Sequence, residues 1–176
     1  MELSKANAFR LEAMIASHLI WYKHYVPWAD DLITRIAKPP VWLMDLSSVK
    51  YVGDATKILG SFVFSEPFES IDQEAHYRDY IGSLLLRYQR RELSWATFLD
   101  EAGKFTDCSS SSETNLPCEY FFEMLNDYED SDFALALEKS QASEIAAEFQ
   151  SAVDSLIPIY QEFRSFYPVA SIPRPE

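Results

Sequence analysis

The sequence predicts an all-α fold, and three observations support that class. Only four glycines occur in 176 residues, so few positions can adopt the positive φ that tight β-turns require. Apolar residues recur every three or four positions through most of the chain, which is the period of an amphipathic helix. Prolines and small polar residues interrupt these periodic segments where helices would begin or end. We therefore expect a single irregular domain, 1–176, of about seven to nine helices, with α-solenoid-like packing open as an alternative.

The first periodic segment runs from Ser4 to about Tyr25 and carries His18 on its apolar side. No partner at metal-site spacing accompanies His18, so we interpret it as a hydrogen-bonded core residue. Pro27 suits the first turn of a second helix, which ends before Pro39. The tryptophans are interpreted as core anchors: Trp21, Trp28, Trp42 and Trp95.

Two further helices are expected before the centre of the chain. Pro40 opens a brief one, because a proline in the first turn loses no intrahelical hydrogen bond. Ser47 or Ser48 is a candidate N-cap for the next, whose apolar residues run from Val52 to Val63 at helical spacing. This stretch therefore predicts a pair of packed helices.

The central helix is expected over 72–91, around which the rest of the chain would pack. Ser70 and Gln73 have the spacing of a capping box, in which each side chain bonds the other's backbone amide. Ser94 is the N-cap candidate of a shorter helix, which we expect to stop at Gly103, since glycine tolerates the left-handed stop conformation.

A polar, Ser-rich run at 107–116 predicts a mobile surface loop. Cys108 and Cys118 flank it, and we expect free thiols because the chain shows no sign of export. Pro117 restarts a helix, a long helix follows, and the proline-rich tail at 168–176 is expected to be extended.

The formal charge of −13 is concentrated late in the sequence. From residue 107 onward only Lys139, Arg164 and Arg174 oppose fourteen acidic residues, which leaves −11. Such a surface repels nucleic acid and anionic lipid and speeds encounter with a basic partner. No apolar run approaches the roughly 20 residues that span a bilayer, and the N-terminus lacks a secretory pattern. A cytoplasmic protein without membrane or nucleic-acid partners is expected.

The densest group of acids, 127–132, has part of the spacing of a calcium-binding loop. Oxygen-bearing side chains stand at its first, third and fifth positions, and Glu138 stands at the twelfth. The sixth position of such a loop requires glycine, whereas this chain has Asp132, whose side chain should resist the sharp turn. We therefore assign no metal and interpret the acids as helix caps and solvated charges.

No catalytic residue and no cofactor is assigned. A nucleophilic cysteine would need a histidine beside it, which spacing in one sequence cannot show, and no phosphate-binding glycine loop is present. The alternative function is a small helical enzyme, metal-assisted, with these candidate residues: Glu119, Glu123, Asp127 and His76.

One run of residues resembles part of a known group of proteins. The run is Tyr88-Gln89-Arg90-Arg91-Glu92-Leu93-Ser94-Trp95-Ala96-Thr97-Phe98-Leu99, followed by Ala102-Gly103, Cys118-Glu119 and Met124-Leu125. It looks like small uncharacterised bacterial helical proteins. In size, acidity and helical content the chain is also similar to immunity proteins that neutralise polymorphic or contact-dependent toxins, a diverse group without a shared motif. Neither resemblance assigns a role to an individual residue.

The expected function is a non-enzymatic protein-binding module. Its acidic surface would dock on a basic partner, such as a nuclease-type toxin, and cover the partner's active site. The candidate partner-binding residues are Glu113, Glu119, Glu123, Asp127, Glu129, Asp130 and Asp132. A structural or adaptor subunit is a further alternative, which an exposed apolar patch would favour.

Overall fold

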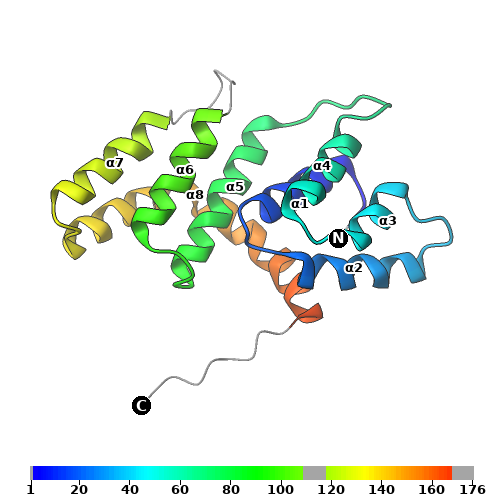
Figure 1. Cartoon of the computed structure of the whole chain (residues 1–176). Helices are drawn as coiled ribbons and strands as arrows, with labels where there is room; N and C mark the ends of the chain where they lie inside the picture. Colours follow the sequence, from blue (N-terminus) through cyan, green and yellow to red (C-terminus); the bar gives the residue numbers. More distant parts are fainter. Residues whose placement is uncertain (1, 109–117, 168–176) are drawn as a thin grey trace, which may run out of the picture. The chain divides into compact units, whose positions relative to one another are not determined.

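The computed structural model describes residues 2–108 and 118–167. These residues form eight α-helices and no strand, which confirms the predicted all-α class (Figure 1). The chain divides into two compact units, of which unit 1 comprises Met1–Glu69 and Ile157–Glu176, and unit 2 comprises Ser70–Leu156. The expected single domain stays a prediction. The expected tail at 168–176 and the loop from residue 109 to 116 lie outside the described residues, and Cys108 belongs to the last turn of a helix.

Unit 1 contains α1 (Lys5–Ala16), α2 (Tyr22–Arg35), α3 (Val41–Ser48), α4 (Val52–Val63) and the last turns of α8 (Leu135–Phe166). α1 packs against α4, and α3 contacts both α2 and α4. The end of α8 joins through Trp28, whose indole N–H donates to Glu162 Oε1 at 3.1 Å. The Trp28 and Phe163 ring centroids lie 4.8 Å apart, so the core of unit 1 includes the end of α8.

The first helix is shorter than predicted because the chain turns sharply after Ala16. His18 has a left-handed φ of 58° and is exposed, so the prediction of a core histidine at this position is wrong. The Ile20 amide donates to the Met14 carbonyl at 3.1 Å and folds the turn back onto α1. The buried histidine of this region is His24, which is 3% exposed.

Two other predicted boundaries in unit 1 are corrected. α2 begins at Tyr22, so Pro27 lies inside the helix and not in its first turn. Neither Ser47 nor Ser48 caps α4, whose N-cap is Tyr51 without a side-chain hydrogen bond. Both serine hydroxyls donate instead to carbonyls of the preceding turn of α3, a local bond that competes with capping.

The tryptophans are core anchors with one exception. Trp28, Trp42 and Trp95 are at most 6% exposed, as predicted. Trp21 is 36% exposed, and its ring lies 4.8 Å from the Lys23 ammonium. It therefore belongs to the surface of unit 1.

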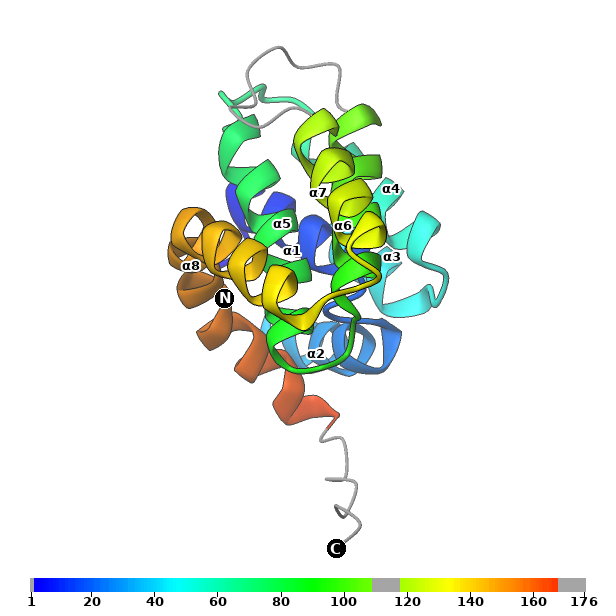
Figure 2. The same cartoon turned by 90° about the vertical axis from the view of Figure 1, so that its left-hand side faces the viewer.

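Unit 2 contains α5 (Gln73–Gln89), α6 (Trp95–Cys108), α7 (Cys118–Asp130) and the first part of α8. α6 lies between α5 and α7, and α8 runs across these helices (Figures 1 and 2). The Tyr80 and Phe105 rings stack at 3.6 Å between α5 and α6, and the Tyr77 and Phe149 rings meet at 6.0 Å between α5 and α8. Aromatic side chains thus contribute to the contacts of α5 with both α6 and α8.

Two glycines mark close approaches between the helices of unit 2. A Cβ on Gly82 of α5 would lie 3.0 Å from the Ala152 Cβ of α8. A Cβ on Gly103 of α6 would lie 2.7 Å from the Phe122 ring of α7. The prediction that Gly103 ends its helix is wrong, since α6 continues to Cys108.

Of the two N-caps predicted in unit 2, one is wrong and one is confirmed. The N-cap of α5 is Asp72, whose carboxylate accepts from the Ala75 amide at 2.9 Å, so the expected capping box of Ser70 and Gln73 is wrong. Aspartate is as good an N-cap as serine and stands closer to the first packed residue of the helix. The prediction that Ser94 is the N-cap of α6 is confirmed, because its hydroxyl accepts a hydrogen bond from the Thr97 amide at 3.1 Å.

Candidate functional site

α7 exposes a row of carboxylates on the side opposite its packed face. Its buried residues are Phe121, Met124 and Tyr128, spaced three and four apart. The exposed acids follow each other at intervals of four, four and three, so they share one face of the helix. We call these four residues the α7 acidic face: Glu119, Glu123, Asp127 and Asp130.

Neighbouring cations do not neutralise this face. α7 contains no lysine or arginine. Across residues 2–108 and 118–167, Glu123, Asp127 and Asp130 form no ion pair. Three arginines of unit 2 pair with acids outside α7: Arg78 with Glu148 at 2.7 Å, Arg87 with Glu101 at 3.6 Å and Arg90 with Glu92 at 2.7 Å. The charges of Glu123, Asp127 and Asp130 are therefore open to solvent.

Four of the seven predicted partner-binding residues make up this face. Glu129 is exposed but points about 100° away from Asp130 around the helix axis. Asp132 is exposed in the turn that follows α7. Glu113 lies outside the described residues. Four of the predicted residues thus share one helix face, whereas Glu129 and Asp132 lie away from it.

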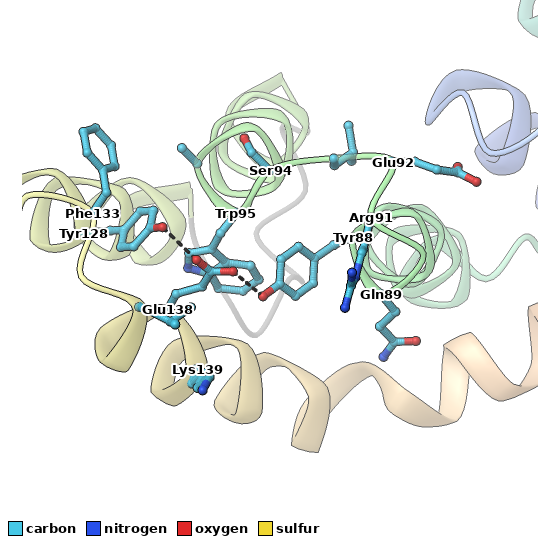
Figure 3. Close-up of a pocket in the computed structure, with 13 residues that line it drawn as sticks. Tyr88, Gln89, Arg91, Glu92, Ser94, Trp95, Tyr128, Phe133, Glu138 and Lys139 are labelled. Atoms are coloured by element: carbon cyan, nitrogen blue, oxygen red, sulfur yellow. Dashed lines mark hydrogen bonds between the residues drawn. The ribbon is translucent and has the colours of Figure 1, made fainter. Parts of the chain in front are cut away.

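A pocket of about 920 Å³ opens where α7 ends (Figure 3). Its walls come from the end of α5, the loop into α6, the first turn of α6, the turn between α7 and α8, and the first turn of α8. Aromatic and apolar side chains line it together with one central carboxylate: Tyr88, Trp95, Tyr128, Phe133, Leu135 and Glu138. We call it the Glu138 pocket.

Glu138 accepts two hydrogen bonds in this pocket, one on each carboxylate oxygen. The Tyr88 hydroxyl donates to Oε1 at 2.7 Å, and the Tyr128 hydroxyl donates to Oε2 at 2.8 Å (Figure 3). Beneath them, the Trp95 indole N–H donates to Gln141 Oε1 at 2.8 Å, and the Gln141 amide donates to the Met124 carbonyl at 2.9 Å. These bonds tie α5, α6 and α7 to the first turns of α8.

Both tyrosine hydroxyls of the pocket are held in their protonated form. Burial raises the pKa of Tyr88, and the hydrogen bond and the negative charge of Glu138 raise it further. The pKa of Tyr128 is raised by the same causes in the same order. At neutral pH both hydroxyls therefore act as donors to Glu138.

The two turns beside the pocket contain residues with left-handed backbone. Arg91 follows α5 with a φ of 62°, and Asp132 and Phe133 follow α7 with φ of 55° and 58°. The expectation that Asp132 resists a sharp turn is thus wrong, because its backbone adopts one. Left-handed backbone costs a non-glycine residue about 1–2 kcal/mol. The Phe133 amide donates to the Tyr128 carbonyl at 2.9 Å, and the Phe133 side chain is left 53% exposed at the pocket.

The described residues hold no group of three or more His, Cys, Asp or Glu side chains that is placed to bind a metal ion. The candidate residues of the enzyme alternative therefore do not form such a group. His76 of α5 lies beside the Phe105 ring of α6, with the ring centroids 6.0 Å apart.

Unit 1 has an apolar surface of its own. A smaller pocket of about 490 Å³ is lined by Trp42 and Phe62, whose rings stack at 5.0 Å, and by Val41. Val41 is 67% exposed, and unit 1 also exposes Tyr51, just before α4, and Phe68, after α4, at 71% and 77%. Exposed groups of large apolar side chains are typical of interaction surfaces.

The Glu138 pocket was not predicted from the sequence, since Tyr88 and Glu138 lie fifty residues apart. One signal was present. Glu138 and Gln141 extend the apolar series of Ile145 and Phe149 toward the start of α8 at spacings of three and four. Polar residues on an otherwise apolar helix face indicate buried hydrogen bonds.

No family model, curated protein or solved structure matches the chain. In the described parts of the chain, no helix has both the length and the apolar character needed to cross a bilayer. Function is therefore inferred from the α7 acidic face and the Glu138 pocket.

Proposed function

We propose that this chain is a non-enzymatic protein-binding module that docks the α7 acidic face on a basic protein. The observation that carries the proposal is the row of exposed carboxylates on α7, of which Glu123, Asp127 and Asp130 have no ion-pair partner among the described residues. Its partner would be of the kind that immunity proteins neutralise, a basic toxin such as a nuclease. The expected cytoplasmic location and the expected lack of membrane and nucleic-acid partners belong to the same proposal.

The physical basis is electrostatic steering onto a rigid element. Like charges three and four residues apart on a helix repel each other by about 0.2–0.5 kcal/mol per pair, so the row weakens the free protein slightly. A basic surface removes that repulsion and accelerates association. Docking over a catalytic cleft would inhibit a toxin by occlusion, without any chemistry in this chain.

The test is a double charge reversal, Asp127→Lys with Asp130→Lys. The wild-type chain is used to capture proteins from its host, and the basic protein that is released between about 50 mM and 500 mM NaCl is purified for calorimetry. We expect the double variant to bind that protein at least about tenfold more weakly, a loss of about 1.4 kcal/mol. The matched control is Asp30→Lys with Glu69→Lys, which changes net charge equally at exposed positions of unit 1.

Three results would contradict the proposal. The first is wild-type affinity in the α7 variant, and the second is an equal loss in the unit 1 control, which would indicate only an effect of net charge. The third is affinity that does not fall with salt, since exposed charge pairs are screened within about 10 Å at 0.1 M.

An adaptor function is the second candidate, favoured by the apolar surface of unit 1. Val41, Tyr51 and Phe68 are each more than half exposed there. Size-exclusion chromatography with light scattering separates the candidates, because an adaptor of this kind would form an oligomer that Tyr51→Ser with Phe68→Ser dissociates. The α7 reversal would leave that oligomer intact.

A further inference from the structure

The last turn of α7 contributes to both the α7 acidic face and the Glu138 pocket, on opposite sides of the helix. Asp127 and Asp130 belong to the face, and Tyr128 between them lines the pocket. A basic partner must therefore reach around the end of α7 to contact both.

We propose that the Glu138 pocket receives an arginine side chain of the basic partner, with its guanidinium against the Glu138 carboxylate. This inference rests on the proposed function and specifies the anchor that the partner would use. Arginine is among the residues that most often dominate binding energy at protein interfaces.

The carboxylate has acceptor capacity left for such a guest. An ionised carboxylate offers about four acceptor positions, and Tyr88 and Tyr128 occupy two of them. Glu138 is half-buried and lines the pocket. A guanidinium can donate two parallel hydrogen bonds to a carboxylate.

The walls suit the flat, weakly hydrated guanidinium better than an ammonium. The half-buried Tyr88 presents its ring beside the carboxylate, whereas Trp95 is 2% exposed and packs behind it, and Arg stacks on aromatic faces more readily than Lys does (Figure 3). At the rim, Phe133 and Leu135 are 53% and 61% exposed and match the methylene part of an arginine side chain.

Two exposed cations line the same pocket and limit what it accepts. Arg91 and Lys139 are both exposed, whereas Glu92 is paired with Arg90 at 2.7 Å. The positive charges of Arg91 and Lys139 favour an acidic side chain, which is therefore the chief competitor of an arginine for this pocket. The central position of Glu138 favours the cation.

The test uses small probes on the full chain: Nα-acetylarginine amide, with the lysine and glutamate amides for comparison. Binding is followed by the NMR signal of the Trp95 indole N–H and by the Tyr88 and Tyr128 ring signals at low salt. We expect saturable shifts with the arginine probe, at least threefold weaker binding of the lysine probe, and none with the glutamate probe. Glu138→Gln should abolish the shifts. Glu144→Gln is the matched control, because Glu144 of α8 also accepts a hydrogen bond from a tyrosine hydroxyl, that of Tyr120, but does not line the pocket.

A second variant keeps the test decisive if Glu138→Gln destabilises the fold. Lys139→Glu changes an exposed residue of the pocket rim and should strengthen binding of the arginine probe at least threefold, while Lys38→Glu in unit 1 should leave it unchanged. Stronger binding of the glutamate probe, or equal arginine binding by the wild type and Lys139→Glu, would overturn the inference.

The two proposals fail separately. If the wild-type chain does not bind the arginine probe but still binds its partner through α7 in a salt-dependent way, the arginine proposal alone is contradicted. If the chain binds the arginine probe but the Asp127→Lys, Asp130→Lys variant keeps wild-type affinity for the partner, the docking proposal alone is contradicted.

Discussion

Glu138 and its two tyrosines are the most informative group at the scale of single residues. Burial and the carboxylate's charge act in the same direction on Tyr88 and Tyr128, and both raise the pKa of these hydroxyls. The folded chain therefore holds these protons more tightly than the unfolded chain, in which tyrosine titrates near 10.0.

The pH dependence follows from that difference. A raised folded-state pKa means that the stabilisation is fully present below pH about 10 and is lost as pH rises through the folded-state value. In Glu138→Gln we expect the pKa of both tyrosines to fall but to stay above the ordinary value, because burial is the largest cause. Titration of the tyrosine Cζ signals by NMR measures each residue separately.

The control for this titration is Glu144→Gln. Glu144 accepts the Tyr120 hydroxyl at 2.7 Å, so this variant should lower the pKa of Tyr120 alone. Unchanged pKa values of Tyr88 and Tyr128 in Glu138→Gln would show that the Glu138 carboxylate does not contribute to raising them.

At the scale of helices, the contact between α5 and α8 depends on the missing side chain of Gly82. A Cβ there would lie 3.0 Å from the Ala152 Cβ and 3.4 Å from a backbone carbon of the same residue. Neither atom can rotate away, unlike the far end of a long side chain. The two helices would have to separate to admit a methyl group.

We therefore expect Gly82→Ala to lower the free energy of unfolding, although alanine is the better helix former. Overpacking costs about 1–3 kcal/mol, which exceeds the helix-propensity gain of about 1 kcal/mol. Urea unfolding measures the change. Gly60→Ala in α4 is the control, since nothing lies within 4 Å of its added Cβ, and it should stabilise by up to about 1 kcal/mol.

A double variant identifies the cause. Adding Ala152→Gly to Gly82→Ala removes the opposing methyl group and should restore part of the lost stability. If the double variant is less stable than the sum of its parts, steric contact between α5 and α8 is not the reason.

At the scale of the whole molecule, the uneven charge affects stability as well as binding. The net charge is −13, and residues from 107 onward account for −11 of it. Self-repulsion of a highly charged chain opposes the compact state. The α7 acidic face places several of these charges one helical turn apart without compensating cations on the same helix.

Added salt should therefore stabilise the protein. Raising NaCl from about 10 mM to about 100 mM shortens the screening length from about 30 Å to about 10 Å. We expect the thermal midpoint to rise by about 2–4 °C for each kcal/mol of repulsion that is removed. Calorimetry of Glu123→Gln with Asp127→Asn should show a smaller rise than the wild type, whereas Asp30→Asn with Glu69→Gln should not. A midpoint that falls with salt would mean that attractive charge pairs outweigh the repulsion.

The sequence predicted the parts of this molecule that depend on local spacing. The brief helix after Pro40 and the N-cap at Ser94 were predicted correctly, since each follows from residues within one or two turns. The sequence also named Glu119, Glu123, Asp127 and Asp130 as partner-binding candidates, but only the structure showed that these four share one exposed face of α7. The break at His18 and the continuation of α6 through Gly103 were missed, because packing against other helices overrides the local preference there.

By itself, the sequence determined the all-α class, the amphipathic helices and the late concentration of acid, because periodicity and composition are properties of neighbouring residues. Only the tertiary structure decided that Tyr88, Trp95 and Tyr128 surround Glu138, since chain segments as much as fifty residues apart must meet to form that pocket. It also decided which acids form ion pairs, because Arg78, Arg87 and Arg90 reach carboxylates on α5, α6, α8 and the loop after α5. Ion pairing depends on distances that folding creates, and no spacing along one chain specifies them.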